Sequence, residues 1–230
     1  MSKRPLMVQD PYREVELAMP VQVQDNEDYF QDIHRSLRSN GNPQHVHPPI
    51  RPGVSLINTS VSQMIRNANR IRVCAVTVVN HTRWRLESAG VFVGGGNVLL
   101  PQQPVEPQTA EAFVAQKTAS TATGTYGTAS YLVQGSPDHP LFINVMWSIA
   151  FDRNIFKNRL GVEVGHQYNR DDFQRLYSPL GRRADSETRV FSTRDGLVPI
   201  RIEKNHLLVT GNLGNDSKTE AIIHVYENWA

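Results

Sequence analysis

Short apolar runs separated by turn residues dominate the chain after its first quarter. The runs are rich in Val, Ile, Thr and Phe and are punctuated by Gly, Pro and Asn. Runs of this length and spacing are typical of an all-β sandwich. The pattern predicts a mainly β protein with two packed sheets. Its predicted strands cover residues 70–80, 90–93, 97–100, 112–115, 125–134, 142–151, 161–165, 207–211 and 221–226.

A helical stripe precedes the first strand. Apolar residues recur in steps of mostly three and four, which places them on one face of an α-helix. They are Val54, Ile57, Val61, Met64, Ile65 and Ala68. We predict an amphipathic helix over residues 54–68 that packs on the sandwich. At 1.5 Å per residue it spans about 22 Å, which is less than the ~30 Å hydrocarbon core of a bilayer.

A second, shorter helix is predicted over residues 170–177. Asn169 can cap it, and Asp171 and Asp172 suit the positive end of the helix dipole. The segment 182–194 is polar and is predicted to be a mobile loop.

The first 52 residues have a different composition. They are rich in Gln, Asp, Glu and Pro, with few clustered apolar side chains. Such a segment buries too little surface to offset its chain entropy. We therefore predict a largely disordered N-terminal extension over residues 1–52, with one possible short helix. The prolines Pro48, Pro49 and Pro52 favour an extended linker, and the folded domain is predicted to cover residues 53–230.

Charge and motifs exclude several functions. The formal net charge of +2 gives no nucleic-acid signature, and Cys74 is the sole cysteine. No catalytic motif or metal-ligand spacing appears, so we expect no enzyme, no metal and no cofactor. The segment 51–86 has no Asp or Glu, but it carries Arg66, Arg70 and Arg72 among its basic residues. These form either a solvated face or a contact with anionic headgroups, at about 1 kcal/mol per residue.

Three motifs follow one another in a distinctive order. Arg70 and Arg72 open an apolar strand that ends in Asn80, A-T-G-x-x-G covers residues 122–127, and an aromatic-S-x-x-aromatic-D-x-N pattern covers 147–154. Together with the helical stripe, this order resembles the actinoporin family of pore-forming cytolysins. The resemblance covers roughly residues 55–226. It implies a β-sandwich flanked by two α-helices.

The resemblance also implies a lipid-headgroup site. In that family aromatic rings bind a quaternary ammonium, and hydroxyls bind the phosphate. The matching positions are Ser148, Tyr126, Phe156, Tyr168 and Phe173. An alignment shifted by one residue brings in Gln174 and Arg175 on the second helix instead.

The chain departs from the family at several positions of this site. A serine becomes Gly94, a valine becomes Tyr126, a proline becomes Ala150 and a tryptophan becomes Ile155. The exposed aromatic pair becomes Arg159 and Leu160. The aromatic surface is therefore weaker than the family's, and an altered lipid preference is expected.

The implied function is that of a cytolysin that binds membrane lipids, with phosphocholine or sphingomyelin headgroups as candidates. Such a protein forms homo-oligomers on the membrane and inserts its N-terminal helix, which leads to ion transport and hemolysis. The alternative is a non-lytic module on the same fold that is lectin-like or binds lipid headgroups. Nucleic acid is not an expected partner. The resemblance implies secretion and association with a target membrane. No signal peptide is recognisable, and a cytosolic location stays open.

Overall fold

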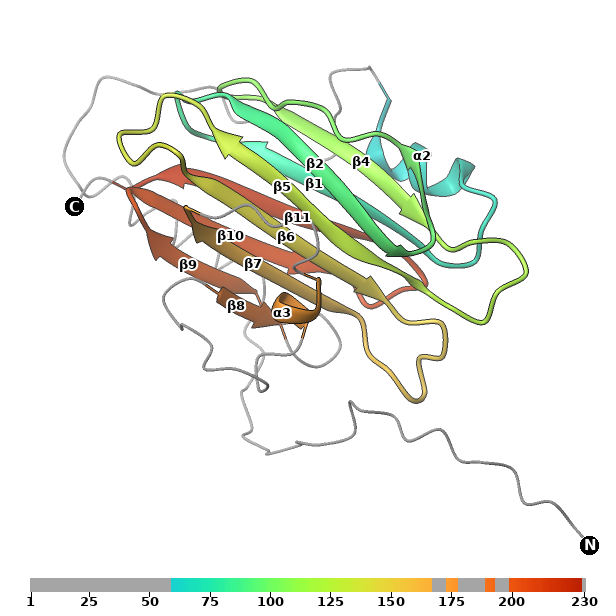
Figure 1. Cartoon of the computed structure of the whole chain (residues 1–230). Coiled ribbons are helices and arrows are strands. Elements are labelled where there is room, and N and C mark those ends of the chain that lie inside the picture. Colours follow the sequence, from blue (N-terminus) through green and yellow to red (C-terminus); the bar gives the residue numbers. More distant parts are fainter. Residues whose placement is uncertain (1–58, 167–172, 178–188, 193–198, 229–230) are drawn as a thin grey trace, which may run out of the picture. The chain divides into compact units, whose positions relative to one another are not determined.

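The computed structural model describes residues 59–166, 173–177, 189–192 and 199–228, which all belong to the unit His47–Ala230. The predicted extension and its boundary at residue 52 lie outside the described residues. One sheet has six strands in the order β3-β4-β1-β11-β10-β9, and the other has five in the order β2-β5-β6-β7-β8 (Figure 1). The predicted two-sheet β-sandwich is therefore confirmed.

The elements of the six-stranded sheet come from both halves of the sequence. They are β1 (Val73–Asn80), β3 (Asn97–Leu100), β4 (Ala110–Gln116), β9 (Ile200–Lys204), β10 (Leu207–Leu213) and β11 (Lys218–Glu227). β1 pairs with β11 in parallel and with β4 in antiparallel orientation. The β1–β11 pair joins the first and the last strand of the described residues.

The five-stranded sheet is formed mostly by consecutive strands. They are β2 (Leu86–Gly95), β5 (Thr125–Val133), β6 (Phe142–Ile149), β7 (Arg159–Gly165) and β8 (Arg189–Ser192). All of its pairs are antiparallel. A short helix, α3 (Phe173–Tyr177), contacts β6 and β7 of this sheet.

The core lies between the two sheets. Alternate side chains of each sheet point inward and form one continuous apolar cluster. Phe113 of β4 and Trp147 of β6 meet there, with ring centroids 5.3 Å apart in an edge-on arrangement. The outward-facing side chains of the five-stranded sheet are left for α3 and for the site described below.

Two strands differ from the prediction. Residues 189–192 form β8, where a mobile loop was predicted, because they pair with β7 and complete the sheet edge. Residues 200–204 form β9, for which no strand was predicted. Its pattern of buried and exposed residues alternates as in any half-buried strand.

The first described helix, α2 (Val61–Asn67), is shorter than the predicted helix over 54–68. Ser60 has extended backbone angles and caps the helix, because its Oγ accepts a hydrogen bond from the Gln63 amide at 3.2 Å. The Oε1 atom of Gln63 accepts a hydrogen bond from the Ser60 amide, which completes a capping box. Ala68 is extended and ends the helix. Val54 and Ile57 lie outside the described residues.

α2 packs on the outer face of the six-stranded sheet. Val61, Met64 and Ala68 are buried there, and Ile65 is partly buried. Their partners are Val73, Ala75, Ala112 and Val114. Three members of the predicted stripe therefore form a compact apolar contact, and Arg66 remains exposed on the other side of the helix.

Asn80, which ends β1, stabilises the turn between β1 and β2. Its buried amide donates to the carbonyl oxygens of Trp84, Val105 and Glu106 at 2.7–3.2 Å. Its Oδ1 accepts from the amide and the hydroxyl of Thr82. The Asn that closes the first motif therefore has a structural role.

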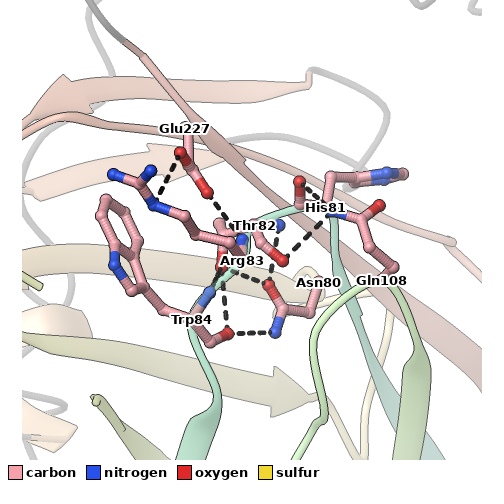
Figure 2. Close-up of polar contacts among 7 residues, drawn as sticks. All are labelled: Asn80, His81, Thr82, Arg83, Trp84, Gln108 and Glu227. Atoms are coloured by element: carbon pink, nitrogen blue, oxygen red, sulfur yellow. Dashed lines mark hydrogen bonds and ion pairs between the residues drawn. The ribbon is translucent and has the colours of Figure 1, made fainter. Parts of the chain in front are cut away.

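The turn is fixed from outside as well (Figure 2). Gln108 donates its side-chain amide to the carbonyl oxygens of His81 and Thr82. Glu227 of β11 accepts from the Arg83 amide at 2.6 Å. These contacts connect the turn between β1 and β2 to β11, the last strand.

Replacing Asn80 with Ala is expected to reduce the free energy of unfolding by roughly 2–5 kcal/mol, because several buried polar groups lose their partners together. Urea denaturation measures the change. Asn97→Ala is the matched control, since Asn97 is exposed on β3 and its loss should change stability by less than about 0.5 kcal/mol. Equal stability of the Asn80 variant and the native protein would contradict this role.

Candidate functional site

Four residues form a row across the outer face of the five-stranded sheet. Gly95 of β2 is in register with Tyr126 of β5, Tyr126 with Ser148 of β6, and Ser148 with Arg159 of β7. Directly opposed residues of antiparallel strands point to the same face. The row therefore brings a glycine, a tyrosine, a hydroxyl and a guanidinium side by side near one end of the sandwich.

Aromatic rings from α3 continue this row. The rings of Tyr126 and Phe173 are tilted, with centroids 4.7 Å apart, and Phe173 stacks on Tyr177 at 5.1 Å. The Arg159 guanidinium carbon lies 4.5 Å from the centroid of the Tyr177 ring. We call Tyr126, Phe173 and Tyr177 the aromatic stack. The Arg159 guanidinium covers the Tyr177 end of this stack.

The glycines of β2 make room for the Tyr126 ring. A Cβ on Gly94 would lie 2.5 Å from Cε2 of Tyr126, and one on Gly95 would lie 2.3 Å from Cε1. The Gly94–Gly95 backbone therefore covers one face of the Tyr126 ring. Gly94 lies next to one edge of the ring, and Gly95 lies next to the other. Gly96 has a positive φ of 97°, which suits the turn into β3.

Gly95→Ala is expected to destabilise the protein by about 1–3 kcal/mol, because the added methyl group would displace Tyr126. The double variant with Tyr126→Val should recover most of this loss, since the smaller side chain frees the space. Chemical denaturation of the variants measures the coupling. Gly165→Ala is the control, because a Cβ there meets no atom within 4 Å. Additive effects of the two substitutions would disprove the steric coupling.

Exposed apolar side chains extend from the same end of the sandwich. Ile155 and Phe156 lie in the loop between β6 and β7 and are 69% and 39% exposed, and Ile71 before β1 is 58% exposed. We call these three residues the apolar tip. Burial of large side chains is the rule in folded proteins, so a group of exposed ones indicates a contact surface.

Arg72 connects the segment that carries Ile71 to the loop after β6 that carries Ile155 and Phe156. Its Nε donates to the carbonyl oxygen of Ala150 at 2.8 Å, and its guanidinium lies 5.7 Å from the Phe151 ring. Lys117 lies 5.4 Å from the same ring and donates to the carbonyl oxygens of Thr118 and Thr121. The segment before β1, the loop after β4 and the loop after β6 therefore meet at one end, on the right in Figure 1.

This end of the sandwich is rich in basic residues. Among the described residues there, the acidic side chains are Asp152 and Asp216. The basic ones outnumber them, and we call the surface the basic end: Arg70, Arg72, Arg153, Lys157, Arg159 and Lys218. An apolar tip surrounded by cations suits contact with a surface that is apolar inside and negatively charged outside.

The structure brings together three of the five predicted headgroup residues. Tyr126 and Ser148 are neighbours on the sheet, and Phe173 contacts Tyr126. Phe156 lies in the loop at the same end, while Tyr168 lies outside the described residues. Phe173 is buried within the stack rather than open to solvent.

Other members of the site were not predicted. The sequence pattern predicts Tyr177 on the second helix but no role for it, and Arg159 replaces an aromatic residue of the family. Their contact depends on the packing of α3 on β7, which sequence spacing does not reveal. The exposure of Ile71 likewise follows from its position just before β1.

The predicted basic contacts have different environments. Arg66 is exposed in the last turn of α2, and Arg70 is partly exposed. Arg72 is engaged with the loop after β6 and so has a structural role in addition to its charge. In the described ranges, no group of three or more His, Cys, Asp or Glu side chains could hold a metal ion.

The sequence of this chain is similar to the sequences of several proteins that have related names. It is 35% identical to Tereporin-Ca1 of Terebra anilis over 114 residues, which are 49% of this chain and 58% of that protein. It is also 35% identical to Bryoporin of Physcomitrium patens over 94 residues, 40% of this chain and 51% of that protein. These relatives are actinoporin-like pore-forming proteins. The resemblance to the actinoporin-like family is confirmed.

The extent of the likeness is limited. The chain spans about half the length of the curated relatives that it matches. No family model matches it. The fold is similar to that of a solved structure, the lipid binding protein Nakanori, with a TM-score of 0.56 and 14% identity over 72% of this chain and 76% of that one. These names describe pore-forming or lipid-binding proteins rather than enzymes.

Proposed function

We propose that this actinoporin-like protein binds lipid membranes through its basic end. The apolar tip enters the interface between headgroups and acyl chains, the basic side chains contact the phosphates, and the aromatic stack with Ser148 and Arg159 receives one headgroup. The observation that carries this proposal is the common location of all three features. Ile71, Ile155 and Phe156 are exposed at the end where the basic residues and the stack lie.

Pore formation is the proposed second step. Membrane-bound copies assemble into a homo-oligomer, and α2 leaves the sheet and inserts, which gives ion transport and hemolysis. The contact of α2 with the sheet is small, since it rests on Val61, Met64 and Ala68. A small contact is more readily released than a large one.

None of the helices within the described residues is long and apolar enough to cross a membrane. The shortness of α2 favours the second candidate, a module that binds headgroups without lysis. Secretion and action at a target membrane suit both candidates, and we propose this location on the basis of the relatives' names.

Liposome experiments test the proposal and separate the two candidates. Co-sedimentation with vesicles of phosphatidylcholine, sphingomyelin or anionic phospholipid measures binding, and release of an entrapped dye measures lysis. Binding with dye release supports the pore. Binding without release supports the module. Absence of binding to every vesicle type would contradict the proposal.

A further inference from the structure

The faces of the aromatic stack are occupied by other groups of the protein. The Gly94–Gly95 backbone covers one side of Tyr126, and Phe173 lies between Tyr126 and Tyr177. The Arg159 guanidinium covers the Tyr177 ring. A quaternary ammonium binds an aromatic ring through an accessible face. The stack as folded therefore offers little ring surface to a choline headgroup.

Arg159 is a cation without a neutralising partner among the described residues. Its contacts are the Tyr177 ring and a long hydrogen bond, 3.5 Å, to the Tyr177 carbonyl oxygen. No carboxylate of the described ranges lies within ion-pair distance of it. The side chain is half-buried against a ring, so solvent screens its charge less than that of a fully exposed arginine. An incoming ammonium group would be repelled, and an anion would be attracted.

Ser148 supplies a hydroxyl beside this cation. It is in direct register with Arg159 across β6 and β7 and is partly exposed. Side chains opposed in this way have Cβ atoms about 5 Å apart. A planar guanidinium binds two phosphate oxygens at once, and a neighbouring hydroxyl donates to a third. The pair therefore has the chemistry of a phosphate site.

We propose that this site selects an anionic phospholipid over a zwitterionic choline lipid, with the lipid phosphate bound by Arg159 and Ser148. The proposal rests on the proposed membrane-binding function and specifies its ligand. The surrounding basic end favours the same choice, because anionic lipids concentrate negative charge at the membrane surface. Tyr126 contributes by filling the space above Gly94–Gly95.

Vesicle binding by the full chain tests this choice. The probes are vesicles of phosphatidylcholine alone and vesicles of equal parts phosphatidylcholine and phosphatidic acid. The native protein is expected to bind the mixed vesicles roughly tenfold or more tightly, and Arg159→Gln is expected to lose most of that preference. Arg201→Gln on β9 makes the same charge change outside the basic end and should retain the preference. Arg153→Gln within the basic end should reduce the preference by a smaller factor than Arg159→Gln does.

Three results would overturn the proposal. The native protein could bind both vesicle types equally. The Arg153 and Arg159 variants could lose affinity to the same extent, which would indicate diffuse attraction. Inorganic phosphate could bind the lipid-free protein as tightly as the mixed vesicles do, which would assign the site to a free anion. Absence of binding to both vesicle types is a different result, because it contradicts the membrane-binding function itself. Thermal unfolding of each variant verifies that its fold is retained.

Discussion

Replacing Ile155 and Phe156 together with Glu is expected to reduce vesicle binding at least tenfold while leaving the melting temperature nearly unchanged. Both side chains are exposed, so they contribute little to folding. Burial of an Ile or Phe side chain contributes about 1.5–3 kcal/mol, and this contribution would be lost at two positions. The two new carboxylates would also be repelled by an anionic surface. Co-sedimentation with vesicles that contain phosphatidic acid measures the loss.

The matched control is Leu99→Glu. Leu99 is 40% exposed, nearly the same fraction as Phe156, but it lies on β3 at the edge of the other sheet. Its replacement should leave binding almost unchanged. If the Leu99 variant lost as much affinity as the double variant, exposed apolar surface in general would explain binding, and the apolar tip would have no special role.

A disulfide between α2 and the sheet is expected to suppress dye release to background without weakening vesicle binding. Cysteines at Met64 of α2 and Val114 of β4 suit this purpose, because both residues belong to the same buried cluster. The bond would hold α2 on the sheet, and insertion requires its release. The basic end and the apolar tip would remain unaltered. Dye release from liposomes before and after reduction with dithiothreitol measures the effect.

The native cysteine does not interfere with this experiment. Cys74 is fully buried, and burial raises the pKa of its thiol well above the ordinary value, so the reactive thiolate is scarce. Full dye release by the oxidised protein would show that α2 need not leave the sheet. Binding without release in both redox states would favour the non-lytic module.

The sequence predicts the sandwich well because strand patterns are local. The apolar run that ends at Asn80 forms β1, and the run around Ser148 forms β6. The predicted and observed ends of both strands differ by only a few residues. The predicted helix 54–68 includes Thr59 and Ser60, which are not helical, because apolar spacing alone does not mark where a helix starts. The sequence Ser60-x-x-Gln63 is a capping-box pattern, and it would have indicated a helix start at residue 61.

The candidate site was less predictable, because it depends on register and on packing between distant elements. Tyr126 meets Gly95 only through a strand pairing that contains irregularities in β2. Arg159 meets Tyr177 through the position of α3 on β7. Sequence motifs indicate which residue types form the site, and the fold determines which faces of their side chains are accessible.

Fluorescence from a single label at the apolar tip tests the central claim most directly. An environment-sensitive dye on a cysteine at Ile155 reports whether the basic end enters the membrane interface. The same dye at Gln134, an exposed residue just after the opposite end of β5, is the control. On addition of vesicles that the protein binds, the Ile155 label should shift to shorter emission wavelength, and the Gln134 label should not change. A shift at Gln134 with none at Ile155 would contradict the account.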